Sequence, residues 1–385
     1  MATPLIIVGE STRAAAKSAL LAGFQPWRID RFVTRDLKDL GSVRQCPTDR
    51  FPTAILELLE DAPPDASVLY TAPLENHPEL LEAIAFDRPL LGCSANAVRQ
   101  VRDPLALANL PTVRGLKFPK VWRSASLRAR LDRAISTLWG GRQYLAKPQA
   151  SWGGRNINFW SLAQRSNHDF YLQQYLHGMP ISAVYVADGW SAQLSGVTEQ
   201  LIGKRSFGAE RFRYCGSVGP INLSDKQRHA LMHLGVVLTQ RFDLRGIFGI
   251  DAIMDRRGQI WPVEVNPRYT DSVELLEQTT NLPLLATHQV DHAAPISKRR
   301  PRTRGQRFCA KSILYTKTHT SIADPDTEFD SDQLTDLPMS NALIPPATPL
   351  CTLHVTASTR DDCLKQLHDR AEKLYRCITT EKPPT

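Results

Sequence analysis

The 385-residue sequence lacks long apolar runs, paired cysteines and a glycine-rich first turn. No run of about 18 or more apolar residues occurs, so we expect no membrane-spanning helix. The seven cysteines are odd in number and include no C-x-x-C pair. This pattern argues against a disulfide framework or a zinc knuckle and favours a reducing cytoplasm. The sequence opens directly on PLIIVGE, which is typical of a first strand rather than a signal peptide.

Positive charge is in modest excess, with 47 Lys and Arg against 39 Asp and Glu and a formal net charge of +8. Such a balance suits partners that carry phosphates. Six of the basic side chains, however, fall in KRRPRTRGQR at 298–307, and the remainder is close to neutral. That decapeptide is typical of a solvated linker, with contact to an anionic substrate and nucleic-acid binding as the alternatives. We do not expect a nucleic-acid partner.

Short apolar runs alternate with helical periods through the first hundred residues. LIIVG (5–9) precedes TRAAAKSALLAG (12–23), and the same alternation continues through SVLYTA and HPELLEAIAF. It predicts a parallel sheet covered on both faces, with residues 1–98 as the first of about two or three domains. The first strand is followed by GESTRA and not by G-x-G-x-x-G, so we do not expect a dinucleotide-binding turn there.

Residues 245–268 read RGIFGIDAIMDRRGQIWPVEVNPR, which predicts a hairpin. With a four-residue loop at 256–259, Asp255 lies opposite Ile260, and the same register puts Asp251 opposite Glu264. The alternating residues then form the apolar face that packs in the core: Ile250, Ala252, Met254, Trp261, Val263 and Val265.

Two opposed carboxylates repel each other unless a cation lies between them. Asp251, Glu264 and Asn266 together offer the hard oxygen ligands that Mg²⁺ prefers when it also holds substrate phosphates. Arg268, just past the strand end, is placed to meet a phosphoryl oxygen. The alternative is a solvated hairpin with an ordinary acidic face.

A second pattern suited to phosphates is YLAKPQASWGGRN at 144–156. Lys147 stands at a strand end, and the glycines after it let backbone N–H groups approach an anion closely. The lysine precedes the glycines, so this is not the G-x-x-x-x-G-K-[ST] loop, and a simple hairpin turn is the alternative. FYLQQYLHGMP at 170–180 predicts a strand whose exit either pairs with a purine edge or is a plain turn.

The second region runs from 99 to 292 and opens on the hinge-like RDPLALANLPTVRG. The stretch at 293–307, basic and proline-containing, predicts a linker. In the remaining residues, 308–385, FCAKSILYT and LCTLHVTA predict strands and RDDCLKQLHDRAEKLYRCI a final helix. This last region is therefore expected to be a small α+β domain.

In this order, GIFGIDAI, WPVEVNPR and YLAKPQASWGG resemble the ATP-grasp superfamily, in which two α+β subdomains hold ATP between them. The resemblance covers about residues 1–300 and is nearest to the predicted ATP-dependent carboligases and carboxylate-amine ligases. It implies a mixed α/β and α+β chain. A pre-ATP-grasp parallel α/β domain (1–98) would precede the two-subdomain ATP-grasp fold (99–292), followed by the linker and a small C-terminal α+β domain (308–385).

Nucleotide contacts follow from the resemblance position by position. Lys147 matches the lysine at the α- and β-phosphates. Gly153 and Gly154 match the flexible loop that closes over the triphosphate, and Gln174 and Leu176 match the hinge whose backbone reads adenine. All five therefore become expected ATP-binding residues.

Metal and phosphoryl contacts are implied in the same way. Glu264 and Asn266 match two metal ligands, Asp251 stands at the position of the other acid, and Arg268 matches the arginine near the transferred phosphoryl group. The implied metal is Mg²⁺, with Mn²⁺ as an alternative.

Two departures from the family pattern concern the nucleotide. Many members have Asp-Lys where this chain has RDP at 102–104, so the first phosphate lysine is absent unless Arg102 substitutes for it. An acidic residue that often binds ribose after the hinge is also missing from GMPIS.

The resemblance implies an ATP-dependent ligase that activates a carboxylate as an acyl phosphate for attack by an amine or similar nucleophile. Its partners would be small molecules, with an association to cofactor or one-carbon carrier metabolism and a cytoplasmic location. A carboxylase-like enzyme that activates bicarbonate and a non-catalytic ATP-binding module are the alternatives. The sequence makes no prediction of oligomeric state.

Overall fold

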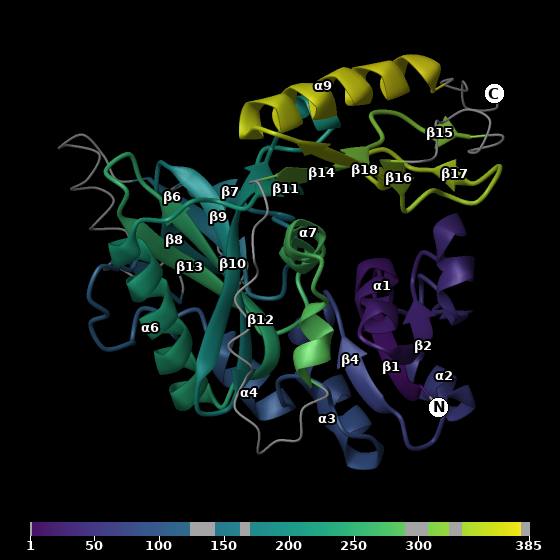
Figure 1. Ribbon diagram of the computed structural model, residues 1–385, viewed down its shortest axis with the longest axis horizontal. Helices are drawn as coiled ribbons and strands as arrows, with labels where there is room; N and C mark the ends of the chain where they lie inside the picture. Colours follow the sequence, from purple (N-terminus) through teal and green to yellow (C-terminus); the bar gives the residue numbers. More distant parts are fainter. Residues whose placement is uncertain (1, 124–142, 162–169, 289–306, 323–332, 379–385) are drawn as a thin grey trace.

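The computed structural model describes residues 2–123, 143–161, 170–288, 307–322 and 333–378. An N-terminal parallel sheet and a long central sheet make up the body, a small four-stranded sheet lies beside them, and helix α9 lies at the C-terminal end (Figure 1). The fold is mixed α/β, as the sequence predicts. In the described part of the chain, no helix is both long and apolar enough to cross a membrane.

The N-terminal sheet is parallel and has the order β3-β2-β1-β4. Ile6 and Val8 of β1 pack with α3 and α4, whereas Leu5 and Ile7 face the small side chains of α1, so the sheet is covered on both faces as predicted. Its elements are β1 (Thr3–Gly9), α1 (Arg13–Leu21), β2 (Phe24–Asp30), η1 (Arg35–Leu40), β3 (Ser42–Gln45), α2 (Ile55–Leu58), η2 (Leu59–Asp61), β4 (Ser67–Tyr70), η3 (Leu74–Asn76), α3 (Pro78–Asp87) and α4 (Ala95–Val101).

The central sheet has eight strands in the order β13-β12-β9-β10-β11-β14-β18-β16. Alternate residues of β9 face opposite helices: Tyr185 packs in the core that contains α6, and Val184 in the core that contains α7. Its elements are β9 (Met179–Asp188), β10 (Ala192–Ile202), η4 (Arg205–Phe207), β11 (Tyr214–Gly219), α6 (Asp225–Phe242), β12 (Arg245–Met254), β13 (Ile260–Asn266), α7 (Asp271–Thr280), η5 (Leu284–His288), β14 (Phe308–Tyr315), β16 (Leu334–Thr335) and β18 (Pro349–Ala357).

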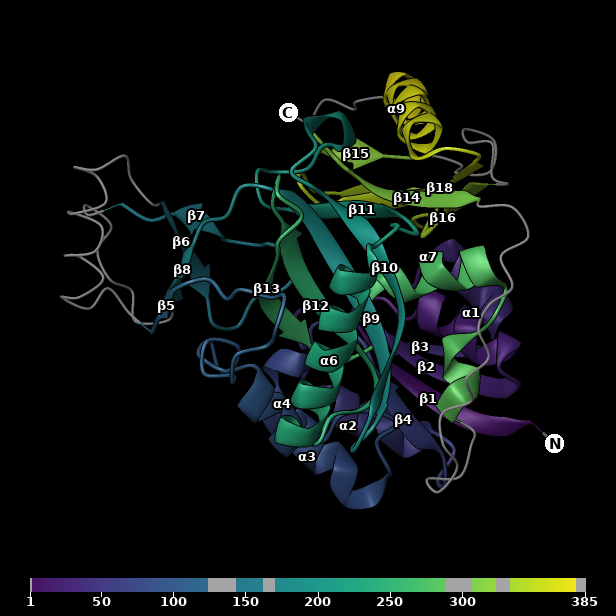
Figure 2. The same ribbon diagram turned by 60° about the vertical axis from the view of Figure 1, so that its left-hand side comes forward.

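The small sheet has the order β5-β8-β6-β7 and projects from the body (Figure 2). Its own core is formed by Tyr144, Ala146, Trp160 and Leu172. Gln173 of this sheet donates from Nε2 to the carbonyl of Val263 at 2.9 Å, which ties the small sheet to the end of the central one. Its strands are β5 (Val121–Trp122), β6 (Tyr144–Pro148), β7 (Asn158–Phe159) and β8 (Phe170–Gln174).

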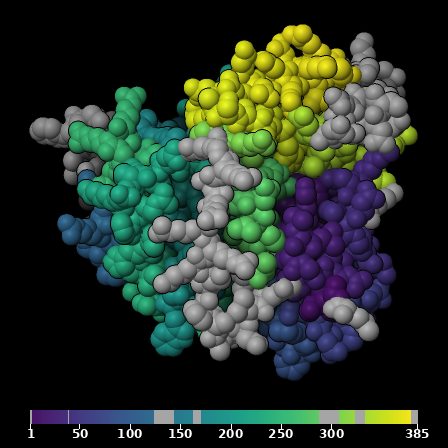
Figure 3. All heavy atoms as spheres, viewed as in Figure 1, coloured from purple at the N-terminus to yellow at the C-terminus, as the bar shows by residue number. Residues whose placement is uncertain are grey.

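The C-terminal residues contain the predicted strands β14 and β18 and the predicted helix α9 (Arg360–Cys377), with a further short pair, β15 (Thr320–Ser321) and β17 (Leu343–Ile344). They form the top of the molecule above the central and N-terminal parts (Figure 3). Because β14 pairs with β11, these strands continue the central sheet. The division at residues 98, 292 and 307 stays a prediction, and 293–306 of the linker lie outside the described residues.

The β12–β13 hairpin corrects one detail of the predicted register. Met254, not Asp255, pairs with Ile260, and the turn spans 255–259. A register shift between Asp251 and Ala252 then brings Asp251 opposite Glu264. The predicted pairing of these two acids is therefore confirmed. The extra residue between the two registers is Val263, so a β-bulge separates the turn from the acid pair.

The bulge changes which residues face the core. Pro262 is buried, whereas Trp261 and Val263, which were expected to face the core, are only half-buried. The prediction that Trp261 and Val263 share the apolar core face is therefore wrong. Trp261 instead donates from Nε1 to Oδ2 of Asp255 at 3.1 Å, across the turn. The physical reason is that one extra residue reverses the alternation of a strand.

Candidate active site

Glu264 lies between two buried cations that come from different parts of the chain. Arg102, at the end of α4, donates from Nη1 to Oε1, and Lys147 Nζ of β6 lies 3.4 Å from Oε2. Burial by itself would raise the pKa of Glu264, but Lys147 and Arg102 outweigh it and hold the pKa at about 2. Glu264 is therefore a carboxylate throughout the physiological range.

Asp251 faces Glu264 from the neighbouring strand but has a different environment. Its carboxylate accepts from Nε2 of Gln200 and from Nδ2 of Asn266, both at 3.0 Å. Burial, and then the charge of Glu264, raise the pKa of Asp251 to about 6. Within the described part of the chain, no Lys or Arg forms an ion pair with Asp251.

The three predicted metal ligands are thus brought together. Asp251 is hydrogen-bonded to Asn266 and paired with Glu264, and all three side chains carry hard oxygens. The electrostatics of Asp251 fit a divalent cation, because two acids are opposed there and the described hydrogen-bond partners of this carboxylate are neutral amide and hydroxyl groups. Which of these oxygens would coordinate the metal stays a prediction.

Arg268 lies beside this group. Its Nε donates to Oε1 of Glu75 at 2.8 Å, and its Nη2 lies 3.4 Å from Oδ1 of Asn266. Burial lowers the pKa of Arg268, but Glu75 raises it by more. Glu75 is buried, and its Oε2 has no hydrogen-bond partner among the described residues. Arg268 is therefore charged, oriented and next to a predicted metal ligand.

The glycine loop lies over the same region. Gly153 and Gly154 have φ values of +59° and +77°, which side-chain-bearing residues rarely adopt. A Cβ on Gly154 would lie 1.8 Å from the carbonyl oxygen of Phe212, whereas a Cβ on Gly153 meets nothing within 4 Å. The carbonyl of Ser151 accepts from Nη2 of Arg102 at 3.3 Å, so the start of the loop is held next to the cation on Glu264.

The predicted hinge is at the exit of β8. The backbone N–H of Gln174 donates to the carbonyl of Lys120 at 2.8 Å and is therefore used inside the protein. Leu176 differs, because its backbone N–H and C=O have no hydrogen-bond partner among the described residues. Of the two, Leu176 has the backbone groups that are open to a ligand.

Sequence reasoning missed four residues that contact this site: Glu75, Asn76, Gln173 and Gln200. Glu75 and Asn76 follow strand β4 closely, and the rule that ligands gather at the carboxyl ends of parallel strands would have singled them out. Gln173 and Gln200 carry no comparable signal. Arg102, noted only as a substitute for a missing lysine, proves to contact Glu264 directly.

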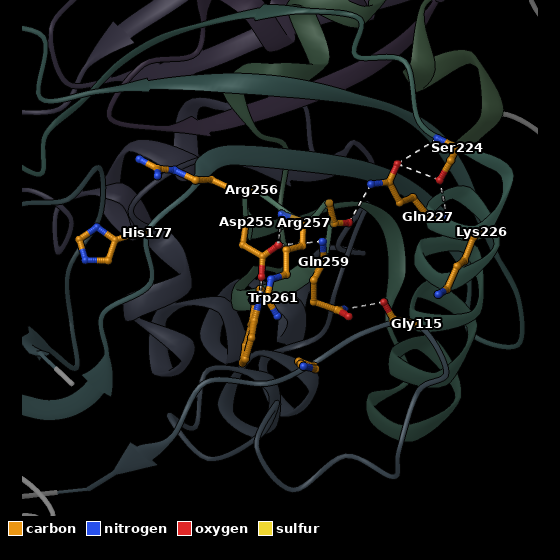
Figure 4. Close-up of a pocket in the computed structure, with 12 residues that line it drawn as sticks. Gly115, His177, Ser224, Lys226, Gln227, Asp255, Arg256, Arg257, Gln259 and Trp261 are labelled. Carbon is orange, nitrogen blue, oxygen red and sulfur yellow. Dashed lines mark hydrogen bonds between the residues drawn. The ribbon is translucent and has the colours of Figure 1, made fainter. Parts of the chain in front are cut away.

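A separate open hollow of about 770 Å³ lies at the β12–β13 turn (Figure 4). None of the nine predicted site residues is among the described residues that line it. Asp255 is its one acid, and it accepts from Trp261 and from backbone N–H groups of the turn. Four of the other described lining residues are Lys or Arg: Lys117, Lys226, Arg256 and Arg257.

The chain is similar to several solved structures along almost its whole length. The biotin carboxylase domain of 2-oxoglutarate carboxylase from Hydrogenobacter thermophilus, solved with MgADP and bicarbonate, has a TM-score of 0.70 at 13% identity. That match covers 98% of this chain and 90% of the other. The L-amino acid ligase from Bacillus licheniformis has a TM-score of 0.70 at 13% identity, with 99% of both chains covered.

A third structure, N5-carboxyaminoimidazole ribonucleotide synthetase from Thermotoga maritima, has a TM-score of 0.66 at 12% identity and covers 97% of this chain and 98% of its own. Identities this low establish the fold alone. The family described as the ATP-grasp domain matches residues 108–272, which contain Lys147, the glycine loop, the hinge and the acid pair. The predicted fold is thus confirmed, and residues 108–272 of this chain match the ATP-grasp domain.

Proposed function

We propose that the protein is a Mg-ATP-dependent ligase that joins a carboxylic acid to an amine or similar nucleophile. The observation that carries this proposal is the arrangement around Glu264. An acid pair on the central sheet meets Lys147 of the small sheet and Arg102 of α4. This arrangement provides oxygens for a metal and cations for phosphates on facing elements, which phosphoryl transfer requires.

Each residue has a role in this proposal. Lys147 and Arg102 bind the phosphates, the N–H groups of Gly153 and Gly154 cover them, and the backbone of Leu176 meets the adenine edge. When bound, Mg²⁺ neutralises charge on the β- and γ-phosphates. The residues that would hold it are Asp251, Glu264 and Asn266.

Arg268 orients the acid for the chemical step. One carboxylate oxygen of the substrate attacks the γ-phosphorus, and the bond from that phosphorus to the β–γ bridging oxygen breaks. ADP leaves with the bond electrons. The nucleophile then adds to the acyl carbon, loses a proton and expels inorganic phosphate, which leaves an amide when the nucleophile is an amine. No side-chain nucleophile takes part, so catalysis rests on positioning and electrostatics.

Activation of bicarbonate is the second candidate. It is favoured by the likeness to the Hydrogenobacter thermophilus domain, whose structure contains bicarbonate. In that case ADP release would depend on bicarbonate in place of an organic acid. The acid pair and the cations would keep the same roles.

Coupled detection of ADP across a matrix of carboxylic acids, bicarbonate and amines tests the proposal. We expect release of ADP only when an acid and a nucleophile are both present, and a loss of about 100-fold or more in Glu264→Gln. The matched control is Glu79→Gln, because Glu79 is an exposed acid on α3. Tight binding of Mg-ATP with no ADP release in any combination would instead identify a non-catalytic ATP-binding module.

A further inference from the structure

Two charged residues stand at the carboxyl edge of the N-terminal sheet. Glu10 directly follows β1 and Arg31 directly follows β2. Arg31 Nη1 lies 2.8 Å from Glu10 Oε1, and the two side chains are 20% and 12% exposed. In open parallel sheets this edge is where ligands bind. Neither residue has a role in the ATP chemistry described above.

The glycine loop brings a second arginine to the same carboxylate. Trp152 donates from Nε1 to Glu10 Oε2 at 2.7 Å, so both oxygens of Glu10 are engaged. Arg155 Nη2 lies 4.0 Å from Glu10 Oε1, and the guanidinium of Arg155 stacks 4.6 Å from the centre of the Trp152 ring. The glycine loop, which we propose covers the phosphates, therefore contacts the carboxyl edge of the N-terminal sheet through Glu10.

Arg213, just before β11, is the third arginine of this group. Its guanidinium lies 5.1 Å from the centre of the Tyr315 ring. Burial and then the charge of Arg213 lower the pKa of Arg155. The charge of Arg31 also lowers the pKa of Arg155, whereas Glu10 and Tyr315 raise it. Asp271, a carboxylate that acts on Tyr315, is already ion-paired with Lys311 at 3.1 Å.

We name Arg31, Arg155 and Arg213 the arginine cluster. Arg31 and Arg155 share the carboxylate of Glu10, and the charge of Arg213 lowers the pKa of Arg155. The Nε groups of Arg31 and Arg155 are buried and have no hydrogen-bond partner among the described residues. The side chains of Arg31 and Arg155 stay 20% and 31% exposed, and a planar guanidinium fork matches a carboxylate or phosphate well. Within the described residues, the ion pairs of these three arginines involve a single carboxylate, so the cluster carries a net positive charge.

The arginine cluster is connected to the reaction centre through the loop itself. Ser151, the residue before Trp152, accepts through its carbonyl from Arg102, and Arg102 contacts Glu264. The glycine loop therefore contacts both Arg102 and the arginine cluster. A carboxylic acid that reacts next to Arg102 and extends along this loop would meet the arginine cluster with its other end.

We propose that the arginine cluster binds a second anionic group, a carboxylate or a phosphate, on the carboxylic acid that this enzyme activates. The inference rests on the proposed ligase function and adds the class of substrate. Acids with one charge would leave the cluster unpaired and bind weakly. Dicarboxylic and phosphorylated acids would occupy it.

Calorimetric titration of the full chain, with saturating Mg²⁺ and a nonhydrolysable ATP analogue to occupy Lys147 and Arg102, tests this inference. The probes are glutarate and inorganic phosphate, with butyrate as the singly charged match for glutarate. We expect glutarate to bind about tenfold or more tightly than butyrate, and Arg213→Gln to remove that preference. Stronger binding of glutarate would identify a second carboxylate, and stronger binding of phosphate a phosphorylated acid.

The matched control is Arg211→Gln, because Arg211 lies on the ring of Phe159 at 4.6 Å and outside the arginine cluster. Equal binding of butyrate and glutarate, or equal loss in Arg211→Gln and Arg213→Gln, would overturn the inference. Arg31→Gln, at a different point of the cluster, repeats the test if Arg213→Gln folds poorly. Because this readout is binding, it stays distinct from the ADP release that tests the ligase function.

Discussion

Asp251 and Glu264 lie directly opposite each other on β12 and β13, yet their pKa values are shifted in opposite directions, to about 6 and about 2. The difference comes from their neighbours. Glu264 holds Arg102 and Lys147, whereas Asp251 is contacted by amides. The negative charge of Glu264 is therefore stabilised by two cations, whereas burial and then Glu264 destabilise the negative charge of Asp251.

Replacing each acid by its amide should consequently have unequal effects on the metal-free protein. Glu264→Gln leaves two buried cations without their carboxylate, and we expect it to lose about 3 kcal/mol of unfolding free energy. Asp251→Asn removes a repulsion and one hydrogen-bond acceptor, so its change should stay within about 1 kcal/mol. Urea unfolding without Mg²⁺ measures both, and equal losses would contradict the assignment of the cations to Glu264.

Arg102 is expected to serve the nucleotide phosphates in place of a lysine. Arg102→Ala should weaken binding of Mg-ATP about tenfold or more, whereas Arg102→Lys keeps the charge and should lose less. Arg99→Ala is the control, because Arg99 is on the same helix and pairs with Glu82 at the surface. Equilibrium titration with a nonhydrolysable ATP analogue measures the three affinities. Unchanged binding in Arg102→Ala would refute the role.

The two glycines of the loop should respond differently to alanine. Gly154→Ala places a Cβ 1.8 Å from a carbonyl oxygen and must move the loop, so kcat/KM for ATP should fall about 100-fold. Gly153→Ala has free space and costs only the strain of a positive φ, about 1 kcal/mol. Steady-state kinetics of the pair checks this order, and the reverse order would show that the loop sits elsewhere during turnover.

Glu277 on α7 should make stability depend on pH. It accepts from Ser18 Oγ at 2.5 Å and from the backbone N–H of Leu284 at 2.6 Å, and burial raises its pKa to about 7. Since the pKa is higher in the folded state, this group favours folding below its ordinary pKa of about 4.5 and loses that contribution as the pH rises through 7. Glu277→Gln should therefore be more stable than the wild type at pH 8.

Urea unfolding of the wild type and Glu277→Gln at about pH 5 and pH 8 measures that difference. The gap between the two proteins should widen in favour of the variant toward the higher pH. A gap that is constant with pH would mean that Glu277 titrates normally in the folded protein.

The pairing of Asp251 with Glu264 was predictable because both strands have a clear apolar face, and only a few registers bury it. The bulge at Val263 was not, because its carbonyl is held by Gln173 of another sheet. Strand patterns describe a strand and its neighbours, but they contain no information about a contact 90 residues away. The prediction for the side chain of Trp261 was wrong because the sequence pattern of the hairpin does not include this contact.

The predicted metal ligands, the predicted phosphate lysine and the glycine loop were singled out from local motifs, and the structure brings these residues together. Glu75, Glu10 and Arg155 were not found, because each acquires its partner through folding of distant segments. The continuation of the central sheet into β14 was equally hidden, since neither strand shows which edge it will join.

That continuous sheet limits how the molecule can open for its substrates. Backbone hydrogen bonds run from β13 through β11 and β14 to β16 without a break, so the C-terminal strands cannot swing away as an independent flap. The small sheet and its glycine loop contact the central sheet through the ion pair of Lys147 with Glu264 and a backbone hydrogen bond from Tyr214 to Gly153, among others, and, among the described strands, not through strand pairing. Nucleotide exchange is therefore expected to displace the small sheet, while the central sheet and its C-terminal strands move together as one rigid unit.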